Sequence, residues 1–343
     1  MKLAIFSAVS TYLPAIEMIA AEIDVSMFVG LSPSQDRSQV AGYMHYADFC
    51  EVRGIPFVEV DDYSLNFECA QDQLSAVDFD IVIVLGWQRL IPPWVLNKSR
   101  FGFIGVHGSM TGITAGRGRS PLNWAKILGA TTFDVSLFFM SEDADDGPVI
   151  ASGSFAIEFE DAIDDLYIKL ASTVADIFVS QWHARKIKRL YANPQLGQSF
   201  YLPARVPSDG AVDWSRTDRE IISFIRALSR PYPGAFSKIG AGRITIWQAR
   251  LGECPESSME AEIGSIISVD EHSNLLVRAG SGLVLLTDYE LSVELDVGQI
   301  GKMGKVESIS FSEQMRSIVQ RHQVAYPNRR ISPLITREIT RTN

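Results

Sequence analysis

The stretch FIGVHGSMTGITAGRGRSPLNW, residues 103–124, joins an apolar run, a histidine and a glycine-rich loop. The apolar run ends at His107, and Arg117 and Arg119 precede a segment of helical character. In open parallel sheets, ligands bind beyond the carboxyl ends of the strands, where the loops emerge. The stretch therefore predicts a strand of such a sheet that delivers His107 to a binding edge.

Short apolar runs alternate with helical patterns on both sides of this stretch. We predict strands at residues 3–7, 25–30, 56–60, 80–86, 101–107, 132–140 and 148–157. We predict helices at 14–23, 41–54 and 161–187, the second ending on Gly54 as a C-cap. Apolar strands that alternate with helices are typical of parallel sheets covered on both faces. The predicted fold class is therefore α/β, with an N-terminal doubly wound, mostly parallel, Rossmann-like sheet.

The second half of the chain has a different pattern. Residues 191–210 are rich in Pro, Gly and polar side chains, which indicates a linker. A helix at 218–228 and short strands at 243–251, 262–269, 274–279 and 282–291 follow, which together indicate a small open β-barrel. We predict a catalytic domain at 1–190, a linker at 191–208, an OB-like barrel at 209–312, and a closing helix with a polar tail at 313–343.

The net charge of −10 lies entirely in the first part of the chain. Residues 1–200 carry 14 basic and 24 acidic side chains, whereas residues 201–343 carry 17 of each. Nucleic-acid binding requires clustered Lys and Arg that neutralise phosphates. A tRNA or DNA partner is therefore disfavoured.

The cysteines and the N-terminus indicate the compartment. Cys50, Cys69 and Cys254 are an odd number without metal-ligand spacing, which favours a reduced, cytoplasmic protein. The N-terminal MKLAIFSAVSTYL has the pattern of a strand and not of a signal peptide, and no apolar window is long enough to span a membrane. A C2 homodimer is the prior expectation for a soluble protein.

An acidic loop, EDADDG at residues 142–147, follows one of the predicted strands. A carboxylate from this loop could orient the imidazole of His107, or favour its protonated form, and so create a proton-handling pair. A hydrogen-bonded structural histidine and a solvated acidic turn are the simpler alternatives. The loop lacks the spacing of a calcium site, so we predict no metal. The segment GITAGRGRS fits neither the P-loop nor the dinucleotide fingerprint, so NAD binding is disfavoured.

Several motifs together resemble the folate-dependent N-formyltransferases, which include methionyl-tRNA formyltransferase and the sugar N-formyltransferases. The strand end GFIGVHGS, the RG-containing arginine loop, the LNW helix start and the later apolar strand leading into DDG carry the resemblance in the first half. In the second half, DGAVDWSRTDREIISFIRAL followed by RPYPGAF resembles the start of the C-terminal barrel of the family. The resemblance covers nearly the whole chain.

The resemblance implies transfer of a formyl group from 10-formyltetrahydrofolate, the co-substrate, to an amine. The family uses an Asn-His-Asp trio, in which His107 matches the histidine and Asp145 the aspartate, as the catalytic residues. The asparagine position holds Gly105, and the sequence SMTG after His107 also departs from the family pattern. The resemblance further implies a folate pocket and an acceptor site; the residues matched to the pocket are Leu85, Gly86, Ile91, Asp143 and Ala144, and those matched to the acceptor site are Ser109, Arg117 and Asn123.

The predicted function is formylation of the amine of a small acceptor, most plausibly an amino sugar linked to a nucleotide. The planar guanidinium of Arg117 suits an anionic acceptor group, although a solvated surface arginine is as common. Ser109, Asn123, a backbone N–H or a bound water are the candidates to replace the missing asparagine. Two alternatives stay open: a methionyl-tRNA formyltransferase, and a catalytically silent member that binds folate or a nucleotide.

Overall fold

The computed structural model describes all residues except 34–39, 41, 241, 254–259, 293–304 and 342–343. It divides into two compact units, which we describe separately. The first unit contains residues 1–114, 132–155 and 167–198, and the second contains 115–131, 156–166 and 199–343. These units reflect packing, whereas the domain boundaries at 190, 208 and 312 were placed from sequence and stay a prediction.

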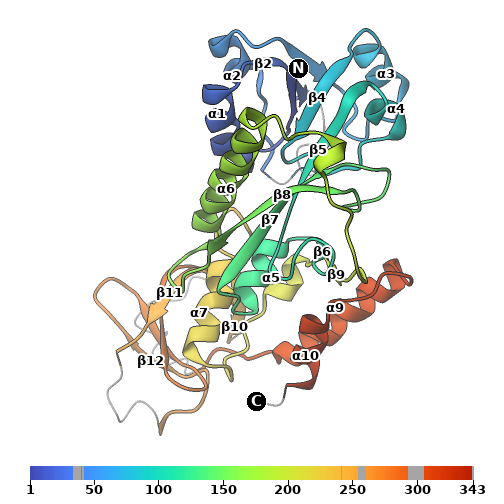
Figure 1. The fold of residues 1–343 in the computed structure, drawn as a ribbon. Helices are drawn as coiled ribbons and strands as arrows, with labels where there is room; N and C mark the ends of the chain where they lie inside the picture. Colours follow the sequence, from blue (N-terminus) through green and yellow to red (C-terminus); the bar gives the residue numbers. More distant parts are fainter. Residues whose placement is uncertain (34–39, 41, 241, 254–259, 293–304, 342–343) are drawn as a thin grey trace. The chain divides into compact units, whose positions relative to one another are not determined.

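The first unit is built on a seven-stranded sheet in the order β3-β2-β1-β4-β5-β7-β8 (Figure 1). The strands are β1 (Leu3–Phe6), β2 (Val25–Leu31), β3 (Phe57–Val60), β4 (Phe79–Val84), β5 (Ser99–Ser109), β7 (Thr132–Phe139) and β8 (Val149–Ala156). The pairs β1–β2, β2–β3, β1–β4 and β4–β5 are parallel, and β5–β7 is antiparallel. The mostly parallel sheet predicted from sequence is confirmed.

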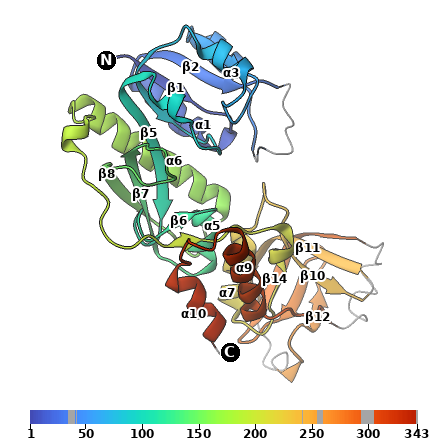
Figure 2. The same ribbon diagram turned by 90° about the vertical axis from the view of Figure 1, so that its right-hand side faces the viewer.

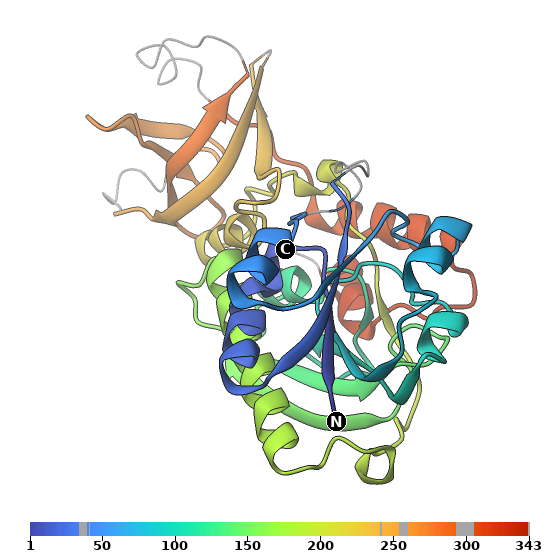
Figure 3. The same ribbon diagram turned by 90° about the horizontal axis from the view of Figure 1, so that it is seen from above.

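Helices cover both faces of this sheet, as a doubly wound fold requires. They are α1 (Leu13–Glu22), α2 (Ala47–Arg53), α3 (Glu68–Leu74), α4 (Pro93–Leu96) and α6 (Ile163–His183), with 3-10 turns η1 (Ser10–Tyr12) and η3 (Arg189–Tyr191). In Figure 3, α1 and α6 lie on one side of the strands, and α3 and α4 lie on the other. The core under α3 and α4 is aromatic: the Phe6 ring packs edge-on against Phe79 and Phe103, each 5.4 Å away between centroids.

Two helix ends differ from the sequence prediction. The helix predicted to start at residue 41 begins at Ala47, because Tyr43 forms a β-bridge with Val9 instead of a helical turn. It ends on Gly54 in the left-handed region, at φ 65°, as predicted. The helix predicted to reach 187 ends at His183, because the chain turns at Arg185, whose φ is 55°.

The second unit contains a five-stranded antiparallel sheet in the order β10-β11-β14-β13-β12 (Figure 2). The strands are β10 (Ala235–Ile239), β11 (Gly242–Leu251), β12 (Ile266–Val269), β13 (Leu275–Arg278) and β14 (Leu283–Leu291). Val306 bridges Ile239 at one edge of the sheet, and its neighbour Lys305 bridges Ser265 beside the other edge. The separate C-terminal domain of β-strands predicted from sequence is confirmed and its sheet is antiparallel, while its OB-like barrel character stays a prediction.

Helices and a two-stranded ladder complete the second unit. The helices are α5 (Pro121–Ile127), α7 (Asp218–Ala227), α9 (Phe311–Ala325) and α10 (Pro333–Thr340), with the 3-10 turn η4 (Pro207–Gly210). Figure 2 shows α9 and α10 side by side, so the tail predicted to be merely polar contains a helix that packs its Ile335 inward. The stretch interpreted as a linker contributes β9 (Tyr201–Leu202), which pairs with β6 (Arg117–Gly118).

Candidate active site

His107 lies near the carboxyl end of β5, where its backbone is opposite Ser136 of β7. Its side chain is only 7% exposed, and its Nδ1 lies 3.4 Å from Oδ2 of Asp145, whose side chain is 25% exposed. The contact is longer than a strong charge-assisted hydrogen bond, which spans about 2.7–2.9 Å. The structure therefore brings together the two residues that the sequence predicted to meet, with the imidazole sheltered and the carboxylate nearer to solvent.

The backbone of the acidic loop holds Asp145 in place. Asp145 itself has φ 55°, a left-handed conformation that few side chains adopt. Two residues later, a Cβ added to Gly147 would lie 1.5 Å from the carbonyl oxygen of Phe139, so only glycine fits there. The DDG motif thus has a physical reason: the glycine lets the loop approach β7, and the turn presents the carboxylate.

Gln195 fastens this loop from a distant part of the chain. Its Nε2 donates to the carbonyl oxygen of Asp145 at 2.7 Å and to that of Gly147 at 2.9 Å. Its Oε1 accepts from the Thr114 hydroxyl at 3.1 Å, which ties in the loop that follows His107. Sequence reasoning missed Gln195, because it lies in the stretch interpreted as a linker and no local pattern distinguishes it.

Tyr12 is a second residue near the pair that the sequence did not indicate. Burial, and then the charge of Asp145, raise the pKa of Tyr12 to about 12. The tyrosine therefore keeps its proton at every working pH. Its ring also limits Gly86, since a Cβ on that glycine would lie 3.0 Å from Cδ2 of Tyr12 and 2.2 Å from Cγ2 of Val9.

Gly105, at the position of the family's asparagine, lies directly opposite Phe138 of β7. A Cβ on Gly105 would lie 2.6 Å from Cζ of Phe138 and 3.1 Å from Cγ of Met140. The buried ring of Phe138 therefore occupies the space beside Gly105 that a side chain would need. A side chain at position 105, asparagine included, would therefore require the Phe138 ring to move.

The segments predicted to bind the pterin lie in the same unit as His107. In the β4–β5 register Ile83 is opposite Ile104, so Leu85 and Gly86 leave the sheet at the edge where His107 lies. The side chains of Leu85 and Ile91 are buried. In the acidic loop, Asp143 is exposed and Ala144 partly exposed. Buried apolar side chains beside backbone N–H and C=O groups suit a flat heterocycle with polar edges. The role of these five residues stays a prediction.

The three predicted acceptor-binding residues are placed differently. Ser109 is buried, and its Oγ accepts from the Thr111 backbone N–H at 3.0 Å, so it stabilises the turn after β5. Arg117 and Asn123 belong to the second unit and are also buried, so Arg117 is not a solvated surface arginine. The Asn123 Nδ2 donates to the Ala227 carbonyl at 2.8 Å, which uses one of its two N–H groups and leaves the other, together with Oδ1, for another role. Their acceptor-binding role stays a prediction.

The described residues give three further findings. No three His, Cys, Asp or Glu side chains gather there as metal ligands would. No helix in that part of the chain is both long and apolar enough to cross a membrane. Cys50 is buried and Cys69 exposed, both as free thiols, while Cys254 lies outside the described residues.

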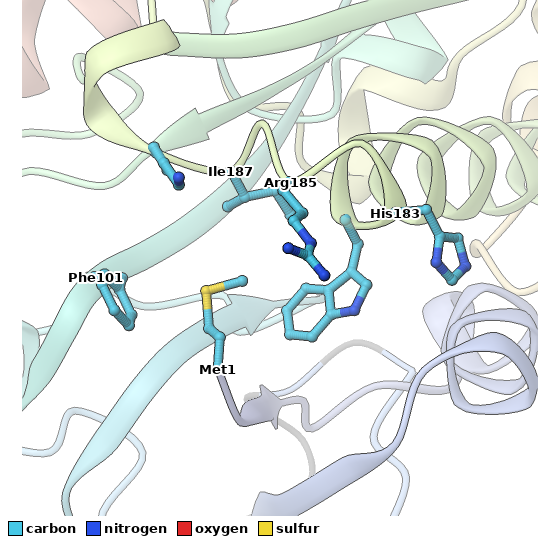
Figure 4. A pocket seen from close by; sticks show the side chains of 7 residues that line it. Met1, Phe101, His183, Arg185 and Ile187 are labelled. Carbon is cyan, nitrogen blue, oxygen red and sulfur yellow. The ribbon is translucent and has the colours of Figure 1, made fainter.

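The first unit also has a hollow with a volume of about 530 Å³, drawn in Figure 4. It is lined by Met1, Phe101 and residues at the end of α6, and contains none of the predicted site residues. Phe101 and His107 lie six residues apart on the same strand, which corresponds to about 20 Å. The size of a cavity therefore does not identify the chemical site here, whereas the pairing of titratable groups does.

Two family models match the chain. The model for formyl transferase matches residues 43–181, and the model for the formyl transferase C-terminal domain matches residues 206–294. The chain belongs to the formyl transferase family. Both halves of a formyl transferase are present in the expected order, and together they account for about two thirds of the chain.

Solved structures show the same fold at low sequence identity. HypX from Aquifex aeolicus in complex with tetrahydrofolic acid matches with a TM-score of 0.60 and 16% identity, over 96% of this chain and 58% of that one. WlaRD, a sugar 3N-formyl transferase in the presence of dTDP and 5-N-formyl-THF, matches with a TM-score of 0.60 and 16% identity. The match covers 86% of this chain and 99% of that one.

A third match is the N-formyltransferase from Helicobacter canadensis, in complex with folinic acid and dTDP-3-aminofucose. Its TM-score is 0.57 at 17% identity, over 84% of this chain and all of that one. The HypX chains are longer than the present chain. The chain described here covers 49% of the length of one HypX variant from Aquifex aeolicus.

Proposed function

We propose that the chain transfers a formyl group from 10-formyltetrahydrofolate to the amine of a small acceptor, most plausibly a nucleotide-linked amino sugar. The observation that supports this most is the pairing of His107 with Asp145 at the carboxyl edge of the sheet, 3.4 Å apart. Family membership and the presence of a folate or formyl-folate in three matched structures point to the co-substrate.

The reaction needs an oxyanion to be stabilised and a proton to be removed. When bound, the folate supplies the formyl carbon, and the pocket of Leu85, Gly86, Ile91, Asp143 and Ala144 would hold its pterin. With Nδ1 turned toward Asp145, the imidazole of His107 presents Nε2 on its opposite edge, where an N–H can donate to the carbonyl oxygen as it gains charge. The Asp145 carboxylate orients the ring, and the pair can take the proton that the attacking amine loses and pass it to the tetrahydrofolate nitrogen, whose bond to the formyl carbon breaks as the new bond forms.

Gly105 means that one donor of the family's trio is replaced or absent. A preorganised donor to an oxyanion contributes about 2.7–4 kcal/mol, or 10²–10³ in rate. We propose that a backbone N–H of the loop after His107 or a bound water takes this role. Ser109 and Asn123 stay candidates as well, because accepting from the Thr111 N–H does not use the Ser109 O–H and donation to Ala227 uses only one of the two Asn123 N–H groups.

The acceptor is proposed from charge and from the matched structures. The second unit carries equal numbers of basic and acidic side chains over residues 201–343, which does not favour tRNA. Two matched structures contain dTDP or a dTDP-linked amino sugar. Arg117 is the residue we propose for the anionic part of the acceptor, because its guanidinium can pair with a phosphate in two parallel hydrogen bonds.

The test is mass spectrometry of the protein incubated with 10-formyltetrahydrofolate and a panel of amines. The panel contains dTDP-linked amino sugars, free amino sugars, amino acids and methionyl-tRNA. We expect the mass gain of one formyl group on a nucleotide-linked amino sugar, and none with the His107→Ala variant. Formylation of methionyl-tRNA alone would overturn the acceptor class.

A catalytically silent member that binds folate is the second candidate, and the packing of Phe138 against Gly105 is the observation that favours it. Calorimetric titration with 5-formyltetrahydrofolate separates the two. Folate binding without transfer to any amine of the panel would favour the silent member, and transfer to any one of them excludes it.

A further inference from the structure

The hollow at the amino end of β5 has the size of a small-molecule site. Its volume of about 530 Å³ falls within the roughly 300–1,000 Å³ of typical ligand pockets. Met1, Phe101, Trp182 and Ile187 supply its apolar lining, and Arg185 and Lys188 supply positive charge. All of them lie in the first unit. In Figure 4 the Arg185 side chain reaches toward Met1, whereas His183 points away from it.

A concentrated run of basic residues follows α6, and two of its members, Arg185 and Lys188, line this hollow. Arg185, Lys186, Lys188 and Arg189 fall within five residues, although residues 1–200 contain only 14 basic side chains against 24 acidic ones. Elsewhere in the unit, cations such as Arg53 lie against carboxylates. Among the described residues, no carboxylate pairs with any member of this run. Like charges that lie close together without a counter-charge repel one another. The many carboxylates of residues 1–200 do not neutralise this run.

Two carboxylates that lie near residues of the lining already have partners. Asp80 accepts from the backbone N–H of Lys2 at 2.8 Å and lies 3.9 Å from the amino group of Met1. Glu22 faces His183 at 3.9 Å. The cations at the hollow therefore remain available to an anion from solution.

The helix end explains only part of this cluster. Cations near a helix C-terminus are favoured by its dipole, but the effect falls off within the last turn. It accounts for Arg185 and Lys186, which directly follow α6, and not for Lys188, which lies five residues beyond its end. The helix dipole also does not explain why a hollow is present or why Trp182 and Phe101 line it.

We propose that this hollow is a second binding site, for a nucleoside polyphosphate. The indole of Trp182 and the ring of Phe101 offer aromatic surfaces on which a base can stack. The Arg185 guanidinium suits bidentate pairing with a phosphate, and Lys188 adds a point charge. The site lies about 20 Å along β5 from His107, so its ligand does not compete for the formyl-transfer site and the proposal does not depend on that activity.

The test is isothermal titration calorimetry of the full chain with three probes: ATP, adenosine and inorganic tripolyphosphate. We expect ATP to bind more tightly than either fragment, because only ATP has both the ring and the charges. The Arg185→Gln/Lys188→Gln double variant is expected to weaken ATP binding at least about tenfold, through loss of two charge-assisted contacts. Both residues are exposed, so the variant should fold normally.

Two controls keep the outcome specific to this site. The Arg250→Gln/Arg316→Gln variant removes the same charge from exposed positions of the second unit and should leave ATP affinity within about twofold. The His107→Asn variant should also retain ATP binding. The proposal is overturned if ATP does not bind, if tripolyphosphate binds as tightly as ATP, or if the Arg250/Arg316 control or His107→Asn weakens ATP as much as the Arg185/Lys188 variant does.

Discussion

The charged pairs around Asp209 and Glu220 in the second unit differ in spacing from the His107–Asp145 pair in the first. In the second unit, Asp209 lies 2.6 Å from Arg321, and Glu220 lies 3.0 Å from Arg216 and 2.9 Å from Arg341. In the first unit, His107 and Asp145 are 3.4 Å apart.

We interpret the close pairs as stabilising the fold and the longer pair as the one that carries out the proposed chemistry. Close pairs with saturated hydrogen bonds have little capacity left for a ligand. A longer pair, held by the backbone around it, can still exchange a proton or contact an oxyanion. Each prediction below tests one side of this comparison, in order of decreasing effect.

Removal of the imidazole should affect chemistry most and stability least. We expect His107→Ala to lower kcat by about 10²–10³, equivalent to about 2.7–4 kcal/mol of transition-state stabilisation. Asp145→Asn should lose most turnover as well, because the ring loses its orienting charge. Formyl transfer is measured at saturating substrate, and thermal unfolding checks that the fold is intact. Near-full turnover in both variants would contradict the assigned roles.

Removal of the Glu220 charge should affect stability most and chemistry least. Burial alone would raise the pKa of Glu220, but hydrogen bonds and charge from Arg216, with hydrogen bonds from Thr217, outweigh it and lower the pKa from 4.5 to about 2. Because the folded pKa lies below the unfolded one, the stabilisation is present above about pH 4.5. It is lost as the pH falls toward 2.

Glu220→Gln should therefore lower the free energy of unfolding at pH 7 by on the order of 2 kcal/mol, and flatten its pH dependence below pH 5. Urea denaturation at several pH values measures both effects. The exposed Glu262, which pairs with Lys305 at 2.9 Å, is the matched control, and Glu262→Gln should change little. If both variants lost the same free energy of unfolding, the pairing of Glu220 would stabilise this unit no more than the exposed pair of Glu262 does.

Restoring the family's asparagine should be costly in this packing. Gly105→Asn forces the Phe138 ring to move, since a Cβ would lie 2.6 Å from its Cζ, and overpacking of this kind costs about 1–3 kcal/mol. In a Phe138→Leu background the same substitution should cost at least about 1 kcal/mol less, because the obstructing ring is gone. Urea denaturation of the four proteins gives the coupling energy, and a value near zero would mean that Phe138 does not exclude the asparagine.

The sequence predicted the parts of this molecule that depend on local pattern. Strand β5 and the β-rich second domain follow from apolar runs in the sequence. The pairing of His107 with Asp145 is expected from the family resemblance, because the acidic loop follows β7, which runs antiparallel to β5, and the rule for the ends of parallel strands does not cover it. The late start of α2 at Ala47 cannot be predicted from local pattern. Tyr43 forms a β-bridge with Val9, which is far from it in sequence, and so does not join the helix.

The remaining features of the site depend on contacts across long sequence separations. Phe138 opposes Gly105 only once β5 and β7 are paired in register. The partners of Gln195 lie at positions 114, 145 and 147, and no window of sequence contains them all. Such a contact leaves no periodic signal, so a glutamine in a polar stretch has the composition of a linker.

Gln195 offers the finest test of the comparison, because it acts on the loose pair only through the backbone. Gln195→Met removes the two hydrogen bonds to the carbonyl groups of Asp145 and Gly147 but keeps the length of the side chain. The acidic loop should then sample positions in which Asp145 no longer faces His107. We expect kcat to fall by roughly tenfold, equivalent to about 1.4 kcal/mol, with little change in KM for the amine.

The neighbouring Gln198 is exposed, so Gln198→Met is the matched control and should leave kcat unchanged. If Gln195 merely stabilised the fold, its loss would lower the unfolding temperature and leave kcat unchanged at temperatures where the variant is fully folded. If it positions Asp145, kcat should fall even at those temperatures, because the imidazole loses the carboxylate that orients it. A lower unfolding temperature with an unchanged kcat would assign Gln195 to the fold and not to the site.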